Sequence, residues 1–96
     1  MVIRIVDIVS GADTADQGLA VHEVIRRALK SGGQVEVSFE AIKTATSSFA
    51  NAAFAQLLSD FSLEEIKNRV RVVQSTRQIN DMIKICVERK SAAEKA

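Results

Sequence analysis

The residue types that most often carry acid–base or nucleophilic chemistry are scarce in this chain. His22 is the only histidine and Cys86 is the only cysteine. His22 lies within an amphipathic stretch, and Cys86 falls at a core-facing position of another, where cysteine behaves as a small apolar residue. No convergent set of acid, base and nucleophile follows from these two residues. We therefore expect a protein that is not an enzyme.

Sequence signals for metals and cofactors are equally weak. A single cysteine excludes both an intramolecular disulfide and a cysteine-based zinc cluster. Asp13 and Asp16 could form a carboxylate pair, but no other metal-binding residue type lies near them in sequence. Gly11 and Gly18 are not part of a glycine-rich phosphate loop. We expect no metal and no cofactor.

The segment Thr44–Ser59 has no Asp, Glu, Lys or Arg, although 26% of the chain is charged. A run of this length would ordinarily carry about four charges. The Ser and Thr residues at 46–48 are strong N-cap types and predict a helix that starts there. Its core-facing stripe is predicted to be Ala50, Ala53, Phe54, Leu57, Leu58 and Phe61.

The opposite face of this helix is small and neutral, where a solvent-facing helix would normally carry Glu and Lys. One interpretation is that the helix is buried on both sides within its own fold. The other is that the face binds a protein partner, because interface centres are depleted of charge. The predicted partner-binding residues are Thr46, Ser47, Ser48, Asn51, Ala52, Ala55, Gln56 and Ser59.

Composition indicates one small globular domain. The chain has 96 residues, of which 47% are apolar, and its formal net charge is +1. This charge gives no strong field for nucleic acid or an anionic membrane, and no apolar stretch approaches the length of a membrane span. No signal peptide is recognisable, so we expect a cytoplasmic location. A local excess of basic residues in the second half suggests a solvated face or an acidic partner: Lys67, Arg69, Arg71, Arg77 and Lys84.

The periodicity of apolar residues predicts the order βαβαβα. Strands are expected at Val2–Val9, Gln34–Phe39 and Val70–Gln74. A first helix should run from a cap at Asp13 or Thr14 to about Ser31, ending at Gly32 and Gly33. Its inward residues are predicted to be Leu19, Val21, Val24, Ile25, Ala28 and Leu29.

After the central helix, Ser62 and Glu65 form a capping-box pattern that predicts a short helix. A last helix should follow a cap at Ser75 or Thr76, with Cys86 on its inward side. We expect the domain to cover residues 1–90 and the tail 91–96 to fray. Right-handed crossovers between neighbouring parallel strands place the helices mainly on one face of a mostly parallel sheet, which is a small α/β layer fold.

Three stretches resemble a STAS-type domain, the fold of bacterial anti-sigma factor antagonists. They are the strand QVEVSFEAIK, the segment TATSSFANAAFAQLL and the strand VRVVQS with its closing helix. The earlier stretch VSGADTADQGLAVHEVIRRAL extends the resemblance over most of the chain. The chain is most similar to short STAS-like domains of unassigned function, in which a Ser-Phe pair opens the central helix.

This resemblance implies partner switching in transcription regulation. In the antagonists, a serine at the start of the central helix is phosphorylated by a GHKL-type kinase, and the unmodified form binds that kinase and frees a sigma factor. The matching residue here is Ser47, with Ser48 beside it. The chain departs from the family pattern at Thr46, where Asp is usual, and at Phe49, where Gly is usual. The alternative is a structural or self-associating module, such as a homodimer, without phosphorylation.

Overall fold

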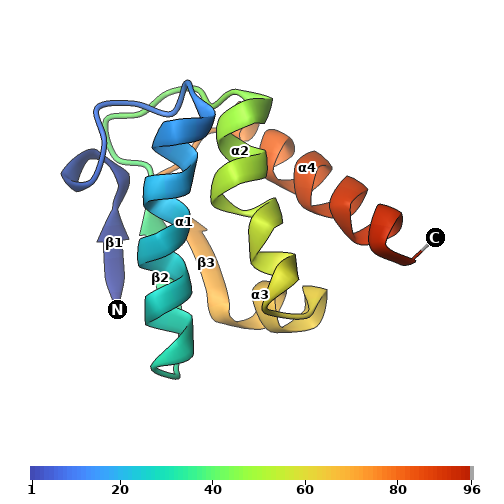
Figure 1. Ribbon diagram of the computed structural model, residues 1–96. Coiled ribbons are helices and arrows are strands. Elements are labelled where there is room, and N and C mark those ends of the chain that lie inside the picture. Colours follow the sequence, from blue (N-terminus) through green and yellow to red (C-terminus); the bar gives the residue numbers. More distant parts are fainter. Residues whose placement is uncertain (96) are drawn as a thin grey trace.

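Three parallel strands form the centre of the structure, a computed structural model that describes residues 1–95 (Figure 1). The strands β1 (Val2–Arg4), β2 (Val35–Ser38) and β3 (Val70–Val73) lie in the order β1-β2-β3. The helices are α1 (Ala15–Lys30), α2 (Ser47–Ala53), α3 (Leu63–Arg69) and α4 (Arg77–Lys95), with 3-10 turns η1 (Ile5–Asp7) and η2 (Ala55–Ser59). This confirms the predicted α/β fold with a parallel sheet.

The helices gather on one face of the sheet. Figure 1 shows α1 and α2 side by side in front of the strands, and α4 packs on α2 and η2. Ile3, Val35 and Val37 are buried under these helices. The side chains at the alternate strand positions lie on the other face of the sheet. Val2, Glu36 and Arg71 form one row across the three strands there. Val2 is 62% exposed, so the second face of the sheet is open around this residue.

Aromatic packing holds the central helix to the sheet. Phe39, which follows β2, lies edge-to-face with Phe49 at 6.3 Å between ring centroids and stacks with Phe54 at 6.1 Å. All three side chains are fully buried. Burying a side chain of this size stabilises a fold by about 1.5–3 kcal/mol, so these phenylalanines fix where α2 begins and ends relative to the sheet.

The local capping signals are confirmed. Thr14 caps α1 in a capping box with Gln17, and Ser62 caps α3 in a capping box with Glu65. Gly32 and Gly33 follow α1 with φ of 92° and 91°, a conformation that glycine adopts at little steric cost.

The predicted first strand, Val2–Val9, is too long. Arg4 pairs with Ser38, the last residue of β2, so β1 has no strand partner beyond Arg4. The chain turns there into η1, which places Ile5 in the core. The apolar residues that suggested a continued strand therefore serve core packing through a 3-10 turn.

Two further expectations about helices are wrong. Leu19 was expected to face inward, but it is 51% exposed, whereas its neighbour Gly18 is buried against α2. The central helix is also shorter than predicted, because α2 ends at Ala53 and the chain continues as η2.

The expected domain boundary at residue 90 falls inside α4. This helix continues to Lys95, and Ser91 is buried. Residues 91–95 of the predicted tail are therefore helical, and residue 96 lies outside the described residues.

Candidate functional site

The start of α2 is held in place by hydrogen bonds to backbone carbonyls of a distant loop. The Thr46 hydroxyl oxygen accepts a hydrogen bond from the N–H of Phe49 at 3.2 Å, so Thr46 is the N-cap. The same hydroxyl donates to the carbonyl of Asp13 at 2.9 Å, and the Thr46 N–H donates to the carbonyl of Ala12 at 3.0 Å. Thr46 thus joins α2 to the loop that precedes α1.

The start of α4 holds the same segment from its other side. The Gln78 side chain accepts from the N–H of Ala45 at 3.0 Å and donates to the Ala45 carbonyl at 2.9 Å. Thr76 caps α4 by accepting from the N–H of Ile79 at 3.2 Å, and its hydroxyl donates to the Lys43 carbonyl at 3.0 Å. Gln78 could not be identified from the sequence, because nothing near it in the chain indicates this two-point contact.

Ser47 and Ser48 are exposed and their hydroxyl groups are unused. They are the first two residues of α2, and neither hydroxyl has a hydrogen-bond partner among the described side chains and backbone groups of residues 1–93. Because Thr46 fills the N-cap position, neither serine is needed to satisfy the first turn of the helix. Both hydroxyls are therefore available to solvent and to another molecule.

The prediction that Ala52 and Ala55 are exposed is wrong. Ala52 is 5% exposed because α1 approaches it through Gly18. Ala55 is 2% exposed and packs in a small cluster with Ala50 and with Cys86 of α4. The small side chains of this segment allow two neighbouring helices of the same chain to pack closely against it. On these two sides the helix is buried within its own fold, as one of the two sequence interpretations stated.

The other predicted partner-binding residues are exposed. We call them the α2 rim: Thr46, Ser47, Ser48, Asn51, Gln56 and Ser59. No member of the α2 rim is charged. The rim consists of hydroxyl and amide groups at the N-cap of α2, on α2 and on η2. Six of the eight predicted partner-binding residues are therefore exposed.

The other residues whose side chains could take part in chemistry, Cys86 and His22, do not form a common site. Cys86 is buried, and desolvation raises the pKa of its thiol, although nearby Arg89 acts in the opposite direction. Its Sγ lies 3.8 Å from the carbonyl oxygen of Ser47, where the thiol is a weak donor. His22 has a buried Nδ1 without a hydrogen-bond partner in the described part of the chain. Among the described side chains of residues 1–93, no three from His, Cys, Asp or Glu gather as metal ligands would.

None of the helices described by the structure combines the length and the apolar character needed to cross a membrane.

A family model described as a STAS-like domain of unknown function (DUF4325) matches residues 17–80. The matched span contains β2, the whole α2 rim, α3 and β3. No curated protein and no solved structure gives a significant match.

Proposed function

We propose that this chain, which belongs to the STAS-like domain family, is a regulatory module. It binds a protein partner through the α2 rim. The proposal rests on the different roles of Thr46 and of the two serines at the start of α2. Thr46 caps the helix, which leaves the hydroxyls of Ser47 and Ser48 exposed and without partners in the described residues. The proposed function is binding, and it requires no catalytic group and no cofactor of this chain.

An uncharged rim suits reversible binding. Charged groups lose much hydration when a partner covers them, and long side chains lose rotamer freedom. The α2 rim consists of short hydroxyl side chains and two amides, Asn51 and Gln56. A partner therefore covers it at a small cost in desolvation and side-chain entropy.

Phosphorylation of Ser47 would raise the cost of covering the α2 rim, because it adds charge there. A phosphoserine carries about −1.5 to −2 charges at neutral pH. At the first turn of a helix this charge is stabilised by the free N–H groups, so the domain keeps its fold. A partner packed on the rim would have to desolvate the phosphate, and binding would be lost. Ser48, one residue further along the exposed turn, is the second candidate phosphoacceptor.

The proposed partner is a GHKL-type kinase or anti-sigma factor in a bacterial cytoplasm, as the resemblance to anti-sigma factor antagonists implies. The two departures from that pattern have structural roles here. Thr46 supplies the cap, a position that Asp also favours. Phe49 is fully buried against Phe39, so the residue after the serines is part of the core.

The test uses the full chain and a purified GHKL-type ATPase from the same genome. We expect binding by isothermal titration calorimetry, a mass increase of one phosphate after incubation with ATP, and loss of that increase in Ser47→Ala. Ser47→Asp should weaken binding at least about tenfold, which corresponds to about 1.4 kcal/mol. Asn68→Asp, which adds one negative charge at an exposed position of α3 outside the rim, is the matched control. Equal affinity of wild type and Ser47→Asp would contradict the switch.

The open face of the sheet favours a second candidate, a self-associating module without phosphorylation. Met1 and Val2 are exposed at 70% and 62%, and parallel sheets are commonly covered on both faces. Analytical ultracentrifugation distinguishes the two candidates. A stable homodimer that Ser47→Asp does not change supports self-association, whereas a monomer that binds the ATPase supports the α2 rim.

A further inference from the structure

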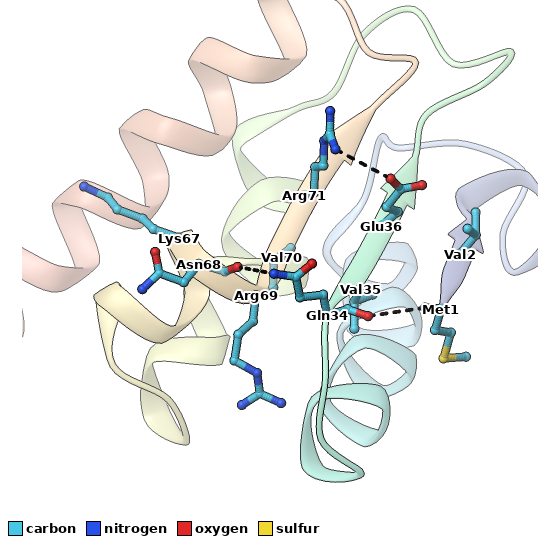
Figure 2. A pocket seen from close by; sticks show the side chains of 10 residues that line it. All are labelled: Met1, Val2, Gln34, Val35, Glu36, Lys67, Asn68, Arg69, Val70 and Arg71. Atoms are coloured by element: carbon cyan, nitrogen blue, oxygen red, sulfur yellow. Dashed lines mark hydrogen bonds and ion pairs between the residues drawn. The ribbon is translucent and has the colours of Figure 1, made fainter.

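A groove of about 460 Å³ opens where the three strands begin, away from the α2 rim (Figure 2). Its lining includes Val2 and Glu36 of the open sheet face, and Lys67, Asn68 and Arg71 from the end of α3 and from β3. Figure 1 places the start of β1 at the opposite end of the molecule from the start of α2. The groove is therefore a second surface, separate from the α2 rim.

The groove has an excess of positive charge. Lys67, Arg69 and Arg71 line it, and Glu36 is its only acidic residue. The Arg71 guanidinium lies 4.0 Å from the Glu36 carboxylate, and its side chain is 78% exposed, so this ion pair is weak. Lys67 is exposed and has no ion pair among the described side chains of residues 1–93. Lys67 and Arg71 are thus available to an anionic group.

Arg69 has a structural role. Its Nε donates to the Gly33 carbonyl at 2.9 Å, and it forms an ion pair with Glu65 at 3.7 Å. Its guanidinium also lies 6.0 Å from the ring centroid of Phe61. Figure 2 shows Arg69 pointing away from Lys67 and Arg71. The two available cations therefore stand apart along one edge of the sheet instead of converging on a single point.

That edge has free backbone groups. The carbonyl of Val73 accepts a hydrogen bond from the N–H of Phe39, so the backbone groups of Val73 point toward β2. Because the direction of these groups alternates along a strand, those of Arg71 point the same way. Val72 therefore directs its N–H and carbonyl away from the sheet. No described strand pairs with β3 on this side. An extended peptide could add here by backbone hydrogen bonds.

We infer that this groove and the edge of β3 bind an extended acidic peptide segment. Acidic side chains along the segment match the separated cations Lys67 and Arg71, while its backbone pairs with Val72 at the edge of β3. A single phosphate would need converging donors. A nucleic acid would need a stacking surface, and the groove lining has no aromatic residue.

The test measures fluorescence anisotropy of a labelled decapeptide of alternating Glu and Val with the full chain. We expect saturable binding that weakens as salt rises from about 50 to 300 mM. Arg71→Glu and Lys67→Glu should each weaken binding about tenfold, whereas Glu36→Gln should tighten it severalfold. Lys84→Glu, an equivalent charge reversal on α4, and Ser47→Asp should leave binding unchanged. Circular dichroism checks that each variant is folded.

Hydrogen exchange provides the second readout, because an added strand would protect the N–H of Val72. Absence of saturable binding would overturn the inference, as would an equal loss in Lys84→Glu. Tighter binding of a uridine decanucleotide that depends on Arg71 would assign the groove to RNA instead. Dimerisation that Arg71→Glu abolishes would assign it to a second copy. Because Ser47→Asp serves as a control, failure here is distinguishable from failure of the α2 rim proposal.

Discussion

Gly18 of α1 lies against Ala52 of α2 so closely that a Cβ atom on Gly18 would come within 2.7 Å of the Cβ of Ala52. It would also lie 2.6 Å from the carbonyl oxygen of Phe49. Both neighbours belong to a helix that the phenylalanines fix in place, so neither can move alone. The contact explains why a residue with poor helix propensity stands inside α1.

Gly18→Ala should therefore destabilise the protein by about 1–3 kcal/mol, although alanine favours helix formation by about 1 kcal/mol over glycine. Urea unfolding followed by circular dichroism measures this free energy. Gly11→Ala is the control, because the nearest obstacle there is the carboxylate oxygen of Asp13, at the end of a side chain that can rotate. A Gly18→Ala protein more stable than wild type would contradict the close packing of α1 on α2.

Replacement of the cap at Thr46 should cost more stability than replacement of either neighbouring serine. Thr46→Ala removes the acceptor for the N–H of Phe49 and the donor to the Asp13 carbonyl, and we expect a loss of about 1–2 kcal/mol. Ser47→Ala and Ser48→Ala should change stability by less than about 0.5 kcal/mol. The three variants are compared by urea unfolding. If Ser47→Ala were as costly as Thr46→Ala, Ser47 would be a cap instead of a free hydroxyl.

Cys86 should make stability decrease at alkaline pH. Burial raises the pKa of its thiol, so the folded chain holds the proton to a higher pH than the unfolded chain. This contribution is complete below the unfolded pKa of about 8.5 and is lost as the pH rises through the raised folded value. The chain has no tyrosine, which removes one competing titration.

We expect the urea midpoint of the wild type to fall more steeply between pH 8 and pH 10 than that of Cys86→Ala. The native thiol should also resist alkylation by iodoacetamide at pH 8 and react once urea unfolds the chain. Parallel pH profiles for the two proteins, together with rapid alkylation of the native state, would show that the thiol is accessible.

Arg69 should be required for stability in a way that lysine cannot replace. Its guanidinium donates to the carbonyls of Gly33 and Leu29, which joins the end of α1 to α3. Lysine lacks this planar fork, so Arg69→Lys should cost about 1–2 kcal/mol in urea unfolding. Arg71→Lys, at an exposed position two residues away, should cost less than about 0.5 kcal/mol. Equal effects of the two substitutions would contradict the structural role of Arg69.

Features that depend on near neighbours in the chain were predictable. The capping boxes of Thr14 and Ser62 and the turn at Gly32 and Gly33 involve groups within four residues of each other. The parallel sheet followed from the same local information, because a strand that alternates with helices has few other ways to pair.

Features that depend on distant segments were not predictable in the same way. Whether Thr46, Ser47 or Ser48 caps α2 is decided partly by the carbonyls of Ala12 and Asp13, far away in the chain. The burial of Ala55 similarly depends on α4, which no periodicity within Thr44–Ser59 reports. An uncharged helix face thus signals close packing but does not identify what packs on it.

The two strand pairings enclose loops of nearly equal length, since Val2 pairs with Glu36 and Val35 pairs with Val70. The entropy lost on closing a loop depends only weakly on its length, so neither pairing has an advantage in the unfolded chain. Contacts between helices must then decide the order of folding. The close approach of α1 to α2 joins the crossover between β1 and β2 to the crossover between β2 and β3, so we expect this one contact to bring both strand pairings together.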